Sequence, residues 1–231
     1  MFSLEITDEA IDLMFAVGAG GVEAEMVFEK EKEMVHAFIN SVDSANIRYA
    51  LIEYAEQATV RANFNEYKEK QDFKQFVNVV KRIGEGVGLD EALQQAAAVF
   101  GNSGRANAKR VLVLFTNAQS KARSNDLQKH SKDLQESGVK VVVVAIGSDV
   151  SEKEINALSS HGEPVLRAQP DDDANAVVKD IASSVLRAEP INRKLQELVV
   201  LHDSSICNPF PPRGSPLTSK IVTRYSLNRV K

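Results

Sequence analysis

The chain has 231 residues, of which 43% are hydrophobic and 26% charged, and its formal net charge is −4. This composition is typical of a globular protein with a full core and excludes fibrous and wholly disordered classes. The first 200 residues carry 23 basic and 31 acidic side chains, and an acidic body argues against nucleic acid as a partner.

Short apolar runs alternate with segments of helical periodicity in the first hundred residues. Continuous or alternating apolar runs predict strands, whereas apolar residues that recur every three or four positions predict helices. The predicted strands of this half are 12–17, 47–54 and 59–64, and the predicted helices are 27–42, 73–80 and 89–100.

The same alternation continues in the second half of the chain. Ser151 and Glu154 have the spacing of a capping box at a helix start, and three aspartates at 171–173 precede another helix, where the macrodipole favours negative charge. The predicted strands are 111–115, 139–146 and 164–166. A polar helix is predicted around Leu127 and Leu134, ending at Gly138, and two further helices are predicted at 151–158 and 174–186.

Apolar strands separated by helices predict an α/β fold: a Rossmann-like open sheet, mainly parallel, with helices on both faces and one antiparallel edge strand. We expect residues 1–189 to form this domain and residues 190–231 to form a partly disordered extension, because Pro190 breaks the pattern. The extension contains Cys207, the lone cysteine, which has no internal disulfide partner. No segment is long and apolar enough for a membrane span.

Glycines after the first strand raise the possibility of a dinucleotide site. Gly18 and Gly20 begin the fingerprint G-x-G-x-x-G, but Glu23 stands at its third glycine position. A carboxylate there faces the pyrophosphate and hinders close helix packing. A nucleotide-dependent enzyme therefore remains only an alternative hypothesis.

Several segments between Asp12 and Leu186 occur in an order and spacing known from one family of domains. They are 12–15, 28–30 with 32–35, 47–54, 83–86 with 91–93, 109–116, 144–147 and 155–159. Together they resemble the von Willebrand factor A domain, and they are most similar to the modules of collagens, matrilins and related matrix proteins. The resemblance implies a protein-binding or adhesion role in the extracellular matrix.

In that family, function often depends on a metal-ion-dependent adhesion site. Its ligands are an Asp-x-Ser-x-Ser motif after the first strand, a Thr in the central loop and an Asp after the third buried strand. Carried over without gaps, these positions are Gly18, Gly20, Val22, Val87 and Asn117. A hard divalent cation needs oxygen ligands, yet four of the five lack a side-chain oxygen and the fifth is neutral. The resemblance thus implies a degenerate site, and we expect no metal and no other cofactor.

The alternative to a functional role for these positions is a purely structural one. Asn117 is expected to be a polar turn residue that closes a loop, and the glycines are expected to let the chain turn sharply. We hypothesise that Val22 and Val87 pack together as an apolar plug where the family holds its ion.

No arrangement of catalytic residues appears, so we expect no enzyme activity. The sequence has no serine elbow, paired carboxylates or Cys/His arrangement, and none of the four histidines stands at a metal-site spacing from another. They are His36, His130, His161 and His202.

The favoured hypothesis is a non-catalytic binding module that acts without a divalent metal. We expect a matrix or cell-surface protein to bind through the loops at the carboxyl ends of the strands. A structural spacer is another alternative. The start of the chain lacks a signal peptide, so a secreted module must derive from a longer precursor, and a cytoplasmic location is the alternative.

Overall fold

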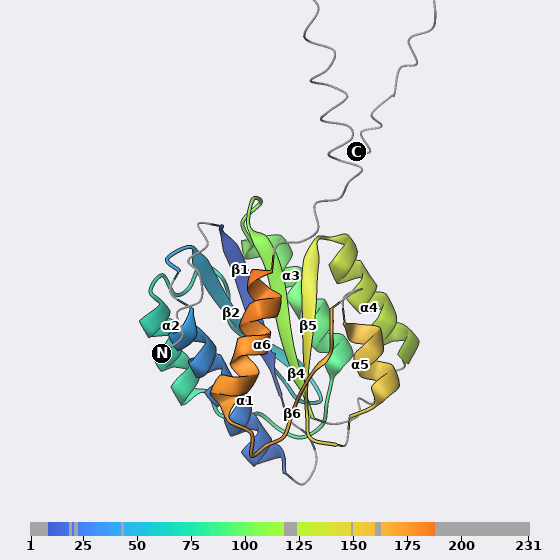
Figure 1. Ribbon diagram of the computed structural model, residues 1–231. Helices are drawn as coiled ribbons and strands as arrows, with labels where there is room; N and C mark the ends of the chain where they lie inside the picture. Colours follow the sequence, from blue (N-terminus) through green and yellow to red (C-terminus); the bar gives the residue numbers. More distant parts are fainter. Residues whose placement is uncertain are drawn as a thin grey trace, which may run out of the picture. The chain divides into compact units, whose positions relative to one another are not determined.

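The computed structural model describes residues 9–18, 20, 23–42, 44–117, 124–148, 150–159 and 163–187 (Figure 1). The chain divides into two units, Met1–Arg187 and Ala188–Lys231, and only the first contains described residues. The boundary expected near Glu189 lies outside them and stays a prediction, as do all expectations for the extension.

Six strands form one sheet at the centre of the first unit. Their order is β3-β2-β1-β4-β5-β6, and all neighbours are parallel except the edge pair of β2 and β3. The predicted fold class is therefore confirmed. The strands are β1 Ile11–Val17, β2 Ile47–Tyr54, β3 Ala58–Ala62, β4 Lys109–Thr116, β5 Val139–Ile146 and β6 Leu166–Ala168.

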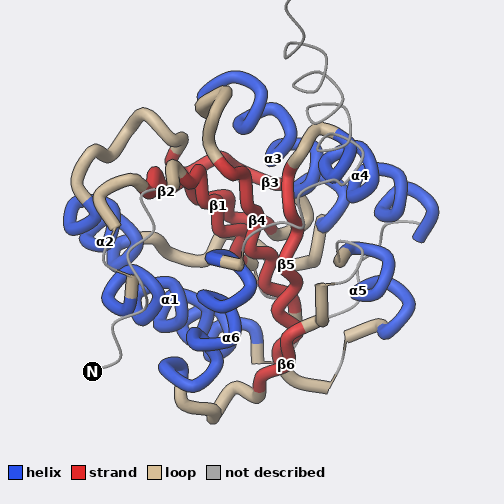
Figure 2. The backbone as a smooth tube through the Cα atoms, turned by 45° about the horizontal axis from the view of Figure 1, so that its top comes forward, coloured by secondary structure: helices blue, strands red, loops and turns tan. Residues whose placement is uncertain are grey.

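Helices cover both faces of this sheet (Figure 2). One face packs against α1 Ala24–Ser41, α2 Lys70–Val79 and α6 Ala174–Leu186, and the other against α3 Leu89–Ser103, α4 Ser124–Glu136 and α5 Glu152–Leu158. Because strand side chains alternate between faces, Leu13 and Phe15 of β1 join the first core while Met14 and Ala16 join the second. All four are fully buried, which explains why β1 reads as a continuous apolar run.

The element order along the chain was predicted correctly, and the differences lie at element ends. Strand β6 begins at Leu166, where it pairs with Val144 of β5, rather than at Pro164, which has no N–H to contribute to a ladder. The capping box is wrong: Ser151 occupies the N-cap position of α5, but its side chain makes no capping hydrogen bond. By contrast, Asp173 caps α6 and accepts a hydrogen bond from the Asn175 N–H.

None of the helices within the described ranges combines the length and apolar character that crossing a bilayer requires.

Candidate binding site at the carboxyl edge of the sheet

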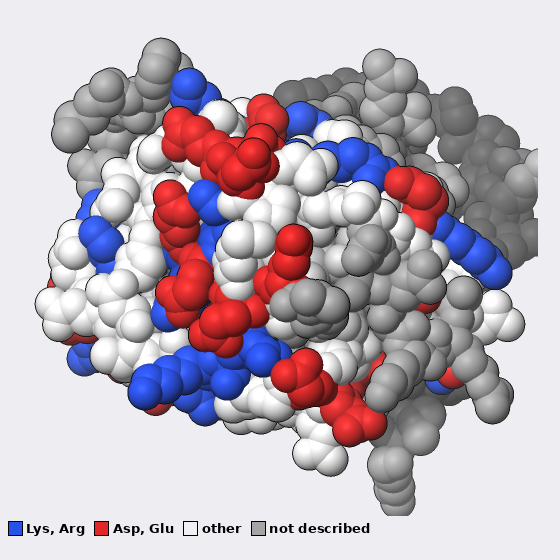
Figure 3. Space-filling model, turned by 90° about the horizontal axis from the view of Figure 1, so that it is seen from below, with Lys and Arg blue, Asp and Glu red and all other residues white. Residues whose placement is uncertain are grey.

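The carboxyl ends of the parallel strands meet at one edge of the sheet. The helix after β1 covers one face and the helix after β4 covers the other, although β1 and β4 are neighbours. This reversal is the switch point at which open α/β sheets bind ligands. Figure 3 views this edge, where clusters of Asp and Glu lie around a smaller group of Lys and Arg.

Asn117, the residue after β4, joins the loops that follow β1 and β4. Its Oδ1 accepts a hydrogen bond from the Gly20 N–H at 2.9 Å, and its Nδ2 donates to the Gly20 carbonyl at 2.8 Å. The residue is 8% exposed. A neutral amide is required for this two-way pairing, because a carboxylate accepts hydrogen bonds but does not donate them. We call this pair the Asn117–Gly20 clasp.

Gly20 also lies against the central loop. A Cβ built on Gly20 would stand 2.6 Å from Cγ2 of Val87, so only glycine allows the contact at this distance. Val87 is buried, with 6% of its surface exposed. Val87 thus occupies space beside the clasp, as the plug hypothesis requires of it, whereas its expected partner Val22 lies outside the described residues.

Gly18 lies equally close to the end of β2. A Cβ on Gly18 would stand 2.2 Å from the Tyr54 carbonyl oxygen and 2.9 Å from two carbons of its ring. The phenol of Tyr54 donates a hydrogen bond to the Phe115 carbonyl, which ties β2 to β4 across β1. The Tyr54 ring therefore fills the space next to Gly18 and leaves no room for a side chain there.

Two buried carboxyl groups lie beneath the loops. Glu31 of α1 accepts a hydrogen bond from the Gly18 N–H at 2.8 Å, and Glu53 of β2 accepts one from the Ile83 N–H at 2.6 Å. Both side chains are fully buried. Burial is the main cause that raises the pKa of each carboxyl above its usual value, and Arg61, 3.4 Å from Glu53, opposes the rise at Glu53.

The segment between α2 and α3 is fastened to the turn that joins β2 and β3. The Glu56 N–H donates to the Glu85 carbonyl at 2.9 Å, and the Gly88 N–H donates to the Ala55 carbonyl at 2.5 Å. The Arg82 side chain pairs with Glu85 at 3.0 Å and with Glu25 of α1 at 3.2 Å. This side of the edge is thus held by several independent bonds.

The positions carried over from the family motif do not fit a divalent cation. Gly18, Gly20 and Val87 offer no side-chain oxygen, and the Asn117 oxygen already accepts the Gly20 N–H. The structure brings Gly20, Val87 and Asn117 together and places Gly18 against Tyr54 instead. Within the described ranges, no cluster of three or more His, Cys, Asp or Glu side chains has the arrangement of a metal site.

Two of the four histidines lie in the described part of the chain. His36 and His130 are both partly buried, on α1 and α4, which cover opposite faces of the sheet, so the sheet lies between them. Burial is the main cause that lowers the pKa of His36. His161 and His202 lie outside the described residues.

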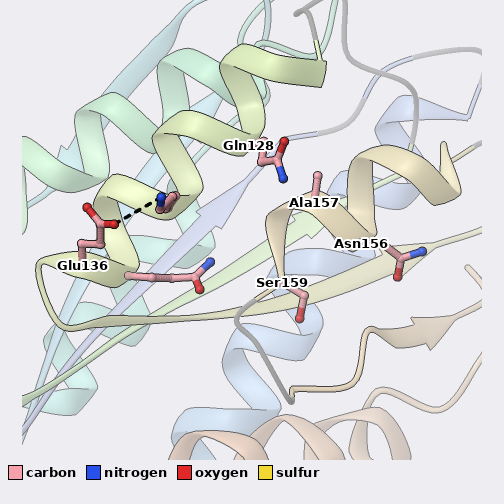
Figure 4. A pocket seen from close by; sticks show the side chains of 7 residues that line it. Gln128, Glu136, Asn156, Ala157 and Ser159 are labelled. Atoms are coloured by element: carbon pink, nitrogen blue, oxygen red, sulfur yellow. Dashed lines mark ion pairs between the residues drawn. The ribbon is translucent and has the colours of Figure 1, made fainter.

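A hollow of about 420 Å³ lies elsewhere, between α4 and α5 (Figure 4). Gln128 of α4 and Ala157 of α5 lie across it from one another, and Lys132 pairs with Glu136 at 3.6 Å. The polar groups of its lining are amides, a hydroxyl and this exposed ion pair, without an activated nucleophile or a buried acid. The carboxyl edge is therefore the better candidate site.

Sequence reasoning missed Glu31 and Tyr54, and it did not predict that Glu53 is buried. A signal existed for Glu31, because it stands three residues after Phe28 and four before Val35 on the buried face of α1. Glu53 likewise interrupts a strand that is otherwise buried and apolar over its last six residues. A charged residue at a core position of the pattern indicates a buried polar interaction.

Comparison with known proteins places this edge in a family context. Residues 12–183 match the von Willebrand factor type A domain. The chain is 19% identical over 194 residues to integrin alpha-M of Mus musculus, with 80% of this chain and 17% of the relative covered. It is 18% identical over 201 residues to the collagen alpha-4(VI) chain of the same organism, with 85% of this chain and 8% of the relative covered. The chain thus spans a small part of these relatives.

Solved structures show the same fold. Proximal thread matrix protein 1 from the mussel byssus, described with a zinc-occupied MIDAS motif, has a TM-score of 0.64 and 19% identity, over 75% of this chain and 46% of that one. The conserved hypothetical protein BatB from Bacteroides thetaiotaomicron has a TM-score of 0.60 and 13% identity, over 76% of this chain and 98% of that one.

Proposed function

The chain belongs to the von Willebrand factor type A domain family, and from that premise we propose that it is a non-catalytic protein-binding module that works without a bound divalent cation. The observation that carries this proposal is the Asn117–Gly20 clasp. In this chain a neutral amide joins the two loops that the family motif would join through ligands of one ion, and both of its polar atoms are already paired.

The surface of the carboxyl edge favours a partner with basic side chains. Glu23, Glu25, Glu56 and Glu85 are exposed in the loops or at the start of α1, and Figure 3 shows acidic groups on this face. Opposite charges steer two proteins toward each other and set specificity more than affinity. The relatives named integrin and collagen support a matrix or cell-surface protein as the partner, and hence an extracellular location.

The described backbone amides of the first loop argue against the nucleotide alternative. A dinucleotide site needs free N–H groups to contact the pyrophosphate. Here the Gly18 N–H donates to Glu31 and the Gly20 N–H donates to Asn117. A dinucleotide site also needs an acid that contacts the ribose. Glu53, at the end of β2, is fully buried and bonded to the Ile83 N–H, so it is not placed to do so.

The test is a binding measurement with purified matrix proteins, including a fibrillar collagen, on the full chain. We expect one of them to bind with the same Kd in Mg²⁺ and in EDTA. Glu23→Gln combined with Glu56→Gln should weaken binding and reduce its salt dependence, whereas Glu136→Gln, at the exposed end of α4, should leave both unchanged. Binding lost in EDTA, or no binding together with thermal stabilisation by NAD, would refute the proposal.

A further inference from the structure

Glu31 has an unusual environment for a carboxyl group. Its side chain is fully buried on the apolar face of α1, and its one hydrogen bond within the described part of the chain comes from the Gly18 N–H at 2.8 Å. The second oxygen, Oε1, has no hydrogen-bond partner among the described residues. No Lys or Arg in the described part of the chain forms an ion pair with Glu31. A buried carboxylate without a cation or a full set of hydrogen bonds is strongly disfavoured.

The ionisable groups around Glu31 do not compensate a negative charge. From β2, Glu53 adds a like charge that raises the pKa of Glu31, and Tyr54 is a neutral phenol close enough that Glu31 raises its pKa. On α1, the Lys32 ammonium is bonded to Glu29 at 2.9 Å.

Two arginines at this edge of the sheet are paired with other acids. Arg61 of β3 pairs with Glu53, and Arg82 pairs with Glu25 and Glu85. Burial, followed by the effect of Glu53, accordingly holds the pKa of Glu31 well above its usual range. The hydrogen bond from Gly18 opposes this rise in the pKa, but its effect is smaller than that of burial.

We propose that Glu31 is a proton-operated latch that holds Gly18, the residue directly after β1, against α1. The neutral carboxyl accepts the Gly18 N–H within an apolar core. Loss of the proton leaves a charge that has one hydrogen bond and no cation among the described residues, and the favourable response is to admit water by moving the Gly18 backbone away from α1. The surface of this edge next to Gly18 therefore changes with pH. The latch is a property of the chain itself and does not depend on which partner binds.

The sign of the pH dependence follows from the raised pKa. Below the usual carboxyl range, Glu31 is neutral in both the folded and the unfolded chain, and its contribution to stability is fully present. As the pH rises toward and through the raised folded pKa, the unfolded chain ionises first and the folding equilibrium constant falls by about tenfold per pH unit.

The experiment compares the full chain with Glu31→Gln, which mimics the neutral carboxyl, and with Glu33→Gln, an exposed residue of the same helix. Unfolding free energy by urea and amide hydrogen exchange by NMR are measured across a series of pH values. We expect the ratio of the folding constants of Glu31→Gln and wild type to rise by up to tenfold per pH unit. We also expect exchange at Gly18, corrected for intrinsic base catalysis, to speed up with pH only in wild type and Glu33→Gln.

Equal pH profiles for wild type and Glu31→Gln would overturn the proposal, because Glu53 also titrates and only the difference between these proteins reports on Glu31. If Glu31→Gln does not fold, the ¹³C shift of the Glu31 carboxyl in wild type decides instead. A midpoint well above the usual range, with Gly18 exchange accelerating at the same pH, supports the latch, and a midpoint near 4.3, the usual value for Glu, refutes it.

Discussion

The substitution Asn117→Asp tests the clasp directly, because it changes one group and keeps the shape of the side chain. It also restores the residue that the family motif has at this position. The carboxylate can still accept the hydrogen bond from the Gly20 N–H. It cannot donate to the Gly20 carbonyl, which now faces a charged oxygen at the 2.8 Å separation of the present Nδ2–O bond.

The expected loss of stability follows from two contributions. A buried acceptor left without its donor costs about 1–3 kcal/mol. A charge placed at a site that is 8% exposed adds the cost of desolvation and the repulsion between the two oxygens. Together they predict a decrease of about 2–4 kcal/mol in the free energy of unfolding at neutral pH. The decrease should become smaller at low pH, because a protonated carboxyl regains a donor.

The assay is urea denaturation of wild type and Asn117→Asp in EDTA and in millimolar Mg²⁺, with Asn156→Asp as a control at an exposed position of α5. The control should change stability by less than about 0.5 kcal/mol. We expect Mg²⁺ to leave the deficit of Asn117→Asp unchanged, since Gly18, Gly20 and Val87 supply no side-chain oxygen. Wild-type stability in Asn117→Asp, or recovery through stoichiometric Mg²⁺ binding, would show that the reasoning about the clasp is wrong.

Two further substitutions test other parts of the structure. Gly18→Ala should lower the free energy of unfolding by about 1–3 kcal/mol or more, the usual cost of overpacking, because its Cβ meets the Tyr54 carbonyl. The control is Gly101→Ala in α3, whose Cβ would have nothing within 4 Å and which should stabilise by up to about 1 kcal/mol. Equal effects of the two substitutions in a denaturation assay would contradict the close approach of Gly18 to Tyr54. Asp173→Ala should lower the Tm at neutral pH by removing the cap of α6. Hydrogen bonds from Asn175 lower the pKa of Asp173. The stabilisation by this cap is therefore present above the usual Asp pKa and is lost as the pH falls through the lowered pKa of Asp173. A Tm difference between wild type and Asp173→Ala that grows on acidification would refute this.

The elements of the fold were predictable because their signals are local. Each buried strand of a parallel sheet is a continuous apolar run, and each covering helix repeats its apolar residues every three or four positions. The end of an element depends on less local information. Strand β6 begins where a backbone partner on β5 becomes available, at Leu166 opposite Val144. Pro164 indicates that the ladder does not start there, but the sequence alone does not identify the partner on β5.

The residue types at the candidate site were predictable from the sequence, but the contacts between them were not. The five positions of the family motif identified which side-chain oxygens are missing, and this follows from sequence alone. The clasp does not, because Asn117 and Gly20 are 97 residues apart and each looks like an ordinary turn residue. The latch residue Glu31 was detectable in principle as an acid on an apolar helix face, but its partner Gly18 is identified only by the folded backbone.

The contact between Gly18 and Tyr54 limits what can be designed at this edge. Any side chain at position 18 needs a differently placed β2 end, since the Tyr54 carbonyl stands 2.2 Å from where a Cβ would be. A single Gly18→Asp substitution is therefore blocked by the backbone itself. A design that adds a ligand for a metal at position 18 must rebuild the Tyr54 turn first.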